Sequence, residues 1–405
     1  MRIPGCFPIA SLALAMAGRV LGGNVVIGYY PSWKRQYLQS ADLSQYTHIN
    51  MAFAIPAEDG TLSFEGDWFL SQVVMDLHGK GVQALLSVGG WTGSNHFSNI
   101  VKTQSKSATL IDSIVKYINM HNLDGIDIDW EYPGRLGNTC NTFDTQFDAI
   151  NFLAFLQRLR WKLNATFGEK AKLITLALRV QPFDGPNGPV PDVSEFAKFV
   201  DYGNLMQYDI NGGWNNETGP NAPLNYEDGK GLPASFSSAI DAWTRAGWPA
   251  NQLVAGFAFY GRSTQALVDM MQDTDNQYQP QSNTVPLGDK EDAPWYDACA
   301  GSTANSGTWQ WKHLRSQGIL DSPTTAVEPW VRKWDAISQT PWLFNRQTRI
   351  YISYDDPWSL QAKVDHGLSR GLAGAMVWSA NMDGTEQELL EVVRKLGNEK
   401  GGGEL

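Results

Sequence analysis

The chain has 405 residues, of which 42% are hydrophobic and 18% charged, a composition typical of a globular protein and not of a disordered one. Its 42 Asp and Glu against 31 Lys and Arg leave a net charge of −11. A chain this acidic repels phosphate backbones and anionic lipid, so nucleic acid and membrane surfaces are excluded as expected partners. The 16 tryptophans suit either a Trp-rich core or an uncharged, flat ligand, and composition does not decide between them.

The first 23 residues have the features of a secretory signal peptide. Arg2 gives a short positive region, and the run Ile9–Ala17 is mostly apolar. Residues 15–17 (Ala-Met-Ala) offer a small-residue cleavage site, and cleavage as late as residue 23 also fits. This run, like every later apolar stretch, is shorter than the about 20 residues that span a bilayer. The sequence therefore predicts a secreted, extracellular protein.

Eight short β-branched or apolar runs follow, with amphipathic helical patterns between most of them. The predicted strands are Val25–Tyr30, His48–Phe53, Gln83–Val88, Gly125–Asp129, Leu173–Arg179, Tyr202–Tyr208, Leu253–Phe259 and Gly374–Trp378. The predicted helices include Thr109–Met120, Thr145–Leu163, Ser235–Ala246 and Leu360–Ser369. Eight strands alternating with helices indicate an α/β fold, a (β/α)8 TIM barrel. A doubly wound open sheet is the alternative, but no G-x-G-x-x-G follows the first strand.

One long stretch between Gly261 and Arg349 breaks this alternation. It is rich in Trp, Gly, Pro and Asp and far exceeds the roughly 2–6 residues usual for a βα loop. Its tryptophans need something to pack on, so residues 263–348 are expected to form an inserted subdomain between the seventh and eighth strands. The barrel would then comprise residues 24–262 and 349–395, and residues 396–405 a disordered tail.

Cysteine and histidine provide little evidence for cofactors. Cys140 and Cys299 remain after removal of the signal peptide, compatible with one disulfide in an oxidising compartment or with two thiols that never meet. The six histidines are scattered, without H-E-x-x-H or C-x-x-C spacing. We therefore expect no metal site and no cofactor.

The segment Asp124–Glu131, DGIDIDWE, is the most informative one. Side chains alternate along a strand, so one face has the carboxylates Asp127, Asp129 and Glu131 and the other has Ile126, Ile128 and Trp130. In a barrel the carboxylates would point into the C-terminal mouth. Clustered carboxylates disfavour each other's ionisation and retain a proton, as acid-catalysed cleavage of an acetal requires. The alternative is an edge strand with a solvated acidic face.

This segment resembles the D-x-x-D-x-D-x-E signature of family 18 glycoside hydrolases, the chitinase family. The likeness covers nearly the whole mature chain and is strongest to secreted fungal members. It includes SVGGW at Ser87–Trp91, MQYD at Met206–Asp209, GFAFYGR at Gly256–Arg262 and GAMVW at Gly374–Trp378. The family's insertion before the last strand is a small α+β subdomain that walls the cleft. Fungal relatives have further cysteines where this chain has other residues, near Asp228 and Ile337, which leaves the pairing of its own two cysteines open.

The resemblance implies a role for each matching residue. Glu131 would protonate the glycosidic oxygen and then activate water, while Asp129 would orient the substrate's acetamide and share a proton with Asp127. Tyr208 would donate to the acetyl carbonyl. The substrate-binding candidates are Asp209, Met206, Trp378, Trp91, Tyr30, Phe53, Arg262 and Trp214; for Trp91, Tyr30, Phe53, Arg262 and Trp214, ordinary packing is an equal alternative.

These matches predict a secreted, monomeric chitinase that hydrolyses β-1,4 bonds between N-acetylglucosamine units by a retaining, substrate-assisted mechanism. One alternative is a chitin-binding protein that has lost turnover, because Arg179 ends the fifth predicted strand on the inward face. There it would pair with the carboxylates and depress the pKa of Glu131, or, as an equal alternative, turn upward and bind substrate or Asp209 without harm to activity. Another is an endo-N-acetylglucosaminidase acting on N-glycans, against which the long insert argues because it suits a linear polymer.

Overall fold

The computed structural model describes residues 25–38 and 41–398. The predicted signal peptide and residues 399–405 lie outside the described residues. Within the described part of the chain, every helix is too short or too polar to cross a lipid bilayer.

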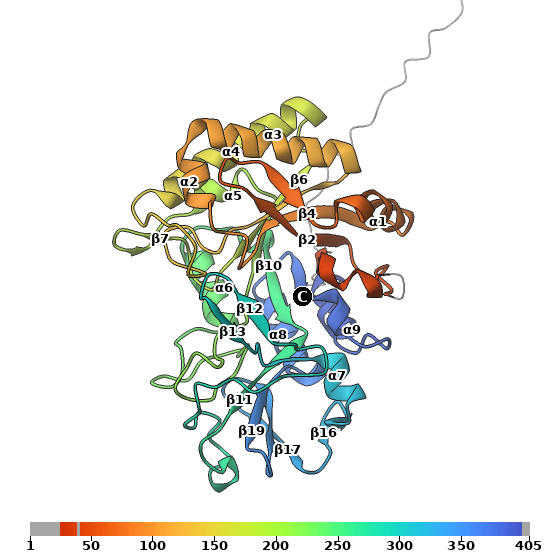
Figure 1. Ribbon diagram of the computed structural model, residues 1–405, viewed down its shortest axis with the longest axis vertical. Coiled ribbons are helices and arrows are strands. Elements are labelled where there is room, and N and C mark those ends of the chain that lie inside the picture. Colours follow the sequence, from red (N-terminus) through yellow and green to blue (C-terminus); the bar gives the residue numbers. More distant parts are fainter. Residues whose placement is uncertain (1–24, 39–40, 399–405) are drawn as a thin grey trace, which may run out of the picture.

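Eight parallel strands form the upper part of the molecule in Figure 1. They are β1 (Val25–Pro31), β2 (His48–Pro56), β4 (Gln83–Gly89), β5 (Gly125–Asp129), β6 (Leu173–Leu178), β9 (Tyr202–Leu205), β10 (Leu253–Ala258) and β20 (Gly374–Trp378). Strand β1 pairs with both β2 and β20, which closes the sheet into a barrel. The predicted TIM barrel is therefore confirmed. The short strand β3 (Leu62–Phe64) adds antiparallel to β2.

Helices surround this barrel. The α-helices are α1 (Asp67–Gly79), α2 (Phe97–Lys102), α3 (Gln104–His121), α4 (Asp148–Phe167), α5 (Ser194–Ala197), α6 (Phe236–Arg245), α8 (Pro357–Ser369), α9 (Leu390–Val393) and α10 (Lys395–Asn398). The 3-10 helices are η1 (Ser32–Tyr37), η2 (Ala250–Gln252) and η4 (Ala380–Met382), with η3 (Met270–Gln272) in the long stretch between Gly261 and Arg349. Helix α6 shows the local cause of such an element: Ser235 caps its N-terminus by accepting from the Ser238 N–H, and its apolar face is buried.

The outward faces of the strands pack against the helices and form the main core. Trp130, just after β5, stacks on Phe97 of α2 at 5.4 Å and meets Phe152 of α4 edge-on at 5.2 Å. A second, smaller apolar cluster fills the barrel interior, with Ile27 and Met376 among its members. The barrel is therefore a packed core and its open end is a mouth for side chains.

The chain between β10 and β20 forms a second sheet below the barrel in Figure 1. Its antiparallel strands, in the order β14-β11-β19-β18-β17, are β14 (Thr308–Gln310), β11 (Tyr260–Gln265), β19 (Ile350–Ser353), β18 (Thr340–Asn345) and β17 (Trp330–Asp335). Helix α7 (Trp311–Ser316) follows β14. This sheet includes residues on both sides of the predicted bounds 263 and 348, and those bounds stay a prediction. That the insertion is a separate subdomain stays a prediction.

Three hairpins complete the structure. They are β7 (Asp184–Gly185) with β8 (Gly188–Pro189), β12 (Trp295–Asp297) with β13 (Ser302–Ala304), and β15 (Leu320–Ser322) with β16 (Thr325–Ala326). The open question about the cysteines is answered, because a disulfide joins Cys140 to Cys299.

The predicted disordered tail was placed too early. Residues 396–398 belong to α10, and Leu396 is buried in the main core, where it lies beside Gly367 of α8. An apolar side chain buried against a neighbouring helix holds this segment in place.

Candidate active site

Strand β5 directs its carboxylates into the barrel mouth, as alternation predicted. Ile126 and Ile128 are buried in the outer core with Trp130, which leaves the opposite face to the acidic side chains. The end of β5 is packed closely against the end of β4. Gly89 has φ +111°, and a Cβ there would lie 2.2 Å from the carbonyl oxygen of Asp129. The glycine in SVGGW is therefore needed for the approach of these two strands.

Asp127 is fully buried and accepts hydrogen bonds from four side chains. Tyr29 Oη and Ser87 Oγ donate to Oδ2 at 2.8 and 2.6 Å, and Thr175 Oγ1 donates to Oδ1 at 2.5 Å. Asn204 Nδ2 lies 3.4 Å from Oδ1. Burial raises the pKa of Asp127 to about 6, although these hydrogen bonds oppose the shift. The four donors come from β1, β4, β6 and β9, so Asp127 joins strands around the barrel.

Asp129 is nearly as buried but has far fewer partners. Its Oδ1 has no hydrogen-bond partner among the described residues. Burial, with repulsion from Glu131 and Asp127, raises the pKa of Asp129 well above its ordinary value. That Asp127 and Asp129 share a proton stays a prediction. An unsatisfied buried carboxyl oxygen at the mouth is available to a polar group of a ligand.

Glu131 lies just beyond β5, and hydrogen bonds hold both its backbone N–H and its backbone carbonyl. Its N–H donates to Ser94 Oγ at 2.9 Å, and its carbonyl accepts from Asn141 Nδ2 at 2.7 Å. Burial raises the pKa of Glu131 to about 7, a hydrogen bond with Tyr132 opposes this, and Asp209 adds to it. Glu131 can therefore hold or release a proton near neutral pH. Sequence reasoning missed Ser94, Tyr132 and Asn141.

Tyr208 and Asp209 lie beyond β9, which ends at Leu205, three residues before the predicted end. The Tyr208 ring is half-buried, and its pKa is raised by burial first and then by Tyr260 and the nearby carboxylates, Asp129 among them. Asp209 accepts from Tyr260 Oη at 2.8 Å and from Arg262 Nε and Nη2 at 2.8 and 2.9 Å. The predicted residues Tyr208, Asp209 and Arg262 are thus brought together at the mouth.

Aromatic side chains form a floor on the other side of the mouth. Trp378 stacks on Phe53 with ring centres 5.6 Å apart and planes 11° apart. Trp33, which sequence reasoning missed, continues this row at 6.3 Å from Phe53. Phe53 and Trp378 pack with Met206 and Tyr208 against the interior cluster. A flat apolar surface beside polar groups suits a sugar ring.

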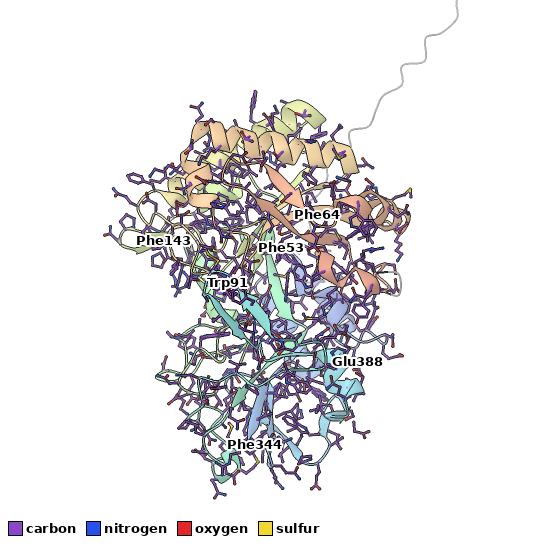
Figure 2. All side chains as sticks on the ribbon, in the orientation of Figure 1. Phe53, Phe64, Trp91, Phe143, Phe344 and Glu388 are labelled. Atoms are coloured by element: carbon purple, nitrogen blue, oxygen red, sulfur yellow. A yellow bond between two sulfur atoms is a disulfide. The ribbon has the colours of Figure 1, made fainter. Side chains whose placement is uncertain are left out.

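Two predicted tryptophans are exposed. Trp91 is 45% exposed and Trp214 is 55% exposed. The Arg262 guanidinium lies 5.6 Å from the centre of the Trp214 ring. Figure 2 labels Trp91 and Phe53 near the middle of the molecule, between the barrel and the lower sheet that includes Phe344.

The prediction for Tyr30 is wrong. Its side chain is fully buried in the outer core, and its Oη donates to the carbonyl oxygen of Lys34 at 3.2 Å. Its neighbour Tyr29 has the inward position and bonds to Asp127. Every residue of β1 is buried, because parallel strands are covered on both faces. The sequence pattern therefore did not show which tyrosine points inward.

The prediction that Arg179 pairs with the β5 carboxylates is also wrong. Strand β6 ends at Leu178, and the guanidinium pairs with Asp184 of β7 at 2.8 Å instead of with the β5 carboxylates. It lies 5.7 Å from the Tyr132 ring. Arg179 is not among the groups that set the pKa of Glu131, which is raised and not depressed. Asp184 is only five residues further along the chain and is within reach of Arg179, whereas the β5 carboxylates lie on a different barrel strand.

Comparison with known proteins agrees with this geometry. The description "Glycosyl hydrolases family 18" matches residues 25–383, which is most of the chain. The chain belongs to glycosyl hydrolases family 18. A crystal structure of a chitinase from Rhizomucor miehei resembles this family 18 protein with a TM-score of 0.83 and 35% sequence identity, covering 92% of this chain and 99% of that one.

Relatives of this family 18 protein have two kinds of description. A "chitinase-like effector" of Moniliophthora roreri is 35% identical over 378 residues, which cover 89% of this chain and 90% of the relative. "Endochitinase 1" of Metarhizium robertsii is 28% identical over 400 residues, which cover 91% of this chain and 84% of the relative. Family membership therefore supports a glycosidase, while the two kinds of relative differ in what they are said to do.

Proposed function

We propose that this protein is a secreted chitinase that hydrolyses β-1,4 bonds between N-acetylglucosamine units. The observation that supports it most is Glu131, a buried carboxyl with a pKa of about 7 at the barrel mouth. Such a group can act as an acid and then as a base in one reaction. Asp129 beside it has an unsatisfied Oδ1. Secretion rests on the predicted signal peptide.

In the first step Glu131 donates its proton to the glycosidic oxygen as the bond to the anomeric carbon breaks. The substrate's own acetamide oxygen attacks that carbon, which gives an oxazolinium ion and retains the configuration after the second step. Asp129 accepts the acetamide N–H through Oδ1 and stabilises the positive charge. In the second step ionised Glu131 takes a proton from water, which attacks the anomeric carbon and opens the ring.

The remaining groups hold the sugar in place. The Tyr208 hydroxyl donates a hydrogen bond to the acetyl oxygen and so orients it for attack on the anomeric carbon. Asp209 contacts the edge of the sugar, and the two-pronged pair with Arg262 fixes its orientation. Trp378 lies beneath the sugar, in stacking contact with Phe53. Asp127 has its acceptors filled by four donors, and so it supports the strands around Asp129.

A second candidate function is chitin binding without turnover, which relatives described as chitinase-like effectors favour. The two functions predict the same binding surface and differ in the chemical step. Arg179, which suggested lost turnover, does not reach the carboxylates. The complete carboxylate row on β5 therefore favours the enzyme.

Incubation of the full chain with N-acetylglucosamine oligomers, with product formation and binding both measured, tests the proposal. The chitinase produces shorter oligomers and leaves fully deacetylated oligomers uncut, because these lack the acetamide nucleophile. Binding without products would contradict the chitinase and support the second function. Cleavage of the deacetylated control would contradict the substrate-assisted mechanism.

A further inference from the structure

The hairpin β12–β13 is tied to the barrel at its tip. The turn of this hairpin contains Cys299, whose disulfide partner Cys140 follows β5. Residues 300–304 are exposed, and so are Trp295 and Tyr296. The hydrogen bonds found for residues 293–304 in the described structure stay within the hairpin. The disulfide is thus its link to the catalytic half of the molecule.

The base of the hairpin is fixed to the lower sheet. Asp292 Oδ2 accepts the N–H groups of Gly288 and Gly307, at 2.7 and 3.0 Å. Ser263 N–H on β11 donates to the Gly307 carbonyl at 2.7 Å, and Arg262 Nη1 donates to the carbonyl of Ser306 at 3.0 Å. Since β11 directly follows β10, the base of the hairpin lies near the end of β10.

The tip is fixed to the loop that holds Glu131. Cys140 precedes Asn141, whose side chain binds the Glu131 carbonyl at 2.7 Å. Thr142 N–H donates to the Asn95 carbonyl at 3.1 Å, which joins this loop to the loop after β4. The disulfide therefore ends on an anchored segment at the end of β5.

Strands β5 and β10 lie three strands apart in the closed eight-strand order, which is close to diametrically opposite. In the closed order β6 and β9 separate them on one side, and β20, β1, β2 and β4 on the other. Strands about 4.8 Å apart and tilted about 36° give an eight-stranded barrel roughly 15 Å across. The seven-residue step from Asp292 to Cys299 can reach about 23 Å when extended. The hairpin is long enough to cross the mouth, and Figure 1 shows it between the barrel and the lower sheet.

We propose that residues 293–304 form a strap across the mouth, anchored by Cys140–Cys299, that makes the site select chain ends and short oligomers over the middle of a long chain. This inference rests on the proposed function for its substrate. A polymer bound at mid-chain must enter from above, where the strap lies, whereas a chain end can pass beneath it. Trp295 and Tyr296 are neighbours on β12, so alternation points their rings to opposite sides. Tyr296 is 66% exposed and Trp295 38% exposed, so Tyr296 is the ring that faces solvent and Trp295 the one toward the cleft.

The test compares the parent with the double variant Cys140→Ser, Cys299→Ser. A second variant keeps Cys140→Ser and replaces residues 294–303 by two glycines. Each is assayed on soluble glycol chitin, with viscosity and new reducing ends followed together. Releasing the strap is expected to increase the viscosity lost per bond cut about threefold or more, because a lid that encloses substrate limits which bonds are reached. Tyr296→Ala, which keeps the disulfide, is the matched control and should resemble the parent.

Both variants are checked for folding by circular dichroism and assayed well below their unfolding temperature. Release of a labelled hexamer from Glu131→Gln, with and without the strap, gives a readout that needs no turnover. Faster release without the strap supports the inference even if the parent proves inactive. Hydrolysis with an unchanged viscosity ratio and unchanged release overturns the strap and leaves the chitinase standing. A parent that neither cleaves nor binds the hexamer overturns both.

Discussion

The carboxylates of the β5 row (Asp127, Asp129 and Glu131) are buried, those at the junction of η1, residues 289–291 and α7 are buried or half-buried, and only the second set has cations beside it. In the β5 row, burial raises the pKa of Glu131 to about 7 and that of Asp127 to about 6. At the junction, Lys34 Nζ lies 2.6 Å from Glu291 Oε2 and Tyr37 Oη donates to Oε1 at 2.9 Å. Burial raises the pKa of Glu291, but these partners outweigh it and bring the value to about 2.

The difference shows what makes a buried acid reactive. The groups that set the pKa values of the β5 carboxylates include no Lys or Arg in the described part of the chain, so burial favours the protonated form. Asp289 at the junction, by contrast, has its pKa raised by burial but brought below its ordinary value by His313 and backbone N–H groups. The carboxylates at the junction are therefore ionised and support the structure. The carboxylates of the β5 row instead retain protons more readily, and their burial lowers the stability of the fold.

The largest expected effect is on turnover, and it comes from replacing Glu131. Glu131→Gln keeps the shape of the side chain and removes the transferable proton, so turnover on N-acetylglucosamine oligomers should fall by roughly 10²–10⁴-fold. Binding of the same oligomers should remain. Glu291→Gln is the matched control and should leave turnover unchanged. Comparable turnover by both variants would show that Glu131 is no more important for the chemical step than Glu291.

The same two variants should shift stability in opposite directions. The raised pKa of Glu131 makes the parent lose stability as pH rises from 4.5 to about 7, so Glu131→Gln should be more stable than the parent above that range by about 1–3 kcal/mol. The lowered pKa of Glu291 contributes stability above pH 4.5 that is lost as pH falls toward 2. Glu291→Gln should therefore be less stable at neutral pH by about 1–2 kcal/mol, reduced by solvent screening. Urea unfolding at several pH values measures both, and equal signs would contradict the comparison.

Arg179→Ala should have the smallest effect. The side chain pairs with Asp184 and reaches the site only through the Tyr132 ring. A cation–π contact is worth about 0.5–1 kcal/mol, so turnover should stay within about fivefold. The pH limb set by Glu131 should not move. A limb shifted to higher pH, with faster turnover, would restore the idea that Arg179 restrains the enzyme.

Much of the fold follows from the sequence because apolar runs and helical periods are local signals. The ends of strands were harder to predict. Strand β9 stops at Leu205, and Gln207 beyond it turns toward α6, accepting the Gly256 N–H at 2.9 Å and donating to the Phe236 carbonyl at 2.8 Å. These partners are 49 and 29 residues away along the chain, so no local pattern indicates them.

The carboxylate row was predictable because its alternation is written in the sequence, Asp-Ile-Asp. Its supports were not, since Ser87, Thr175 and Asn204 each look like a single polar residue in an apolar strand until the barrel closes around Asp127. The disulfide was open for the same reason, because its cysteines are 159 residues apart.

The central claim is that Glu131 is a proton donor because it is buried without a cation, and the pH dependence of kcat/KM on an N-acetylglucosamine tetramer tests it most directly. The donor must be protonated in the free protein. We predict hydrolysis whose kcat/KM falls as pH rises through about 7, the pKa of Glu131. A fall already centred near 4.5, or no hydrolysis at any pH, would contradict the account.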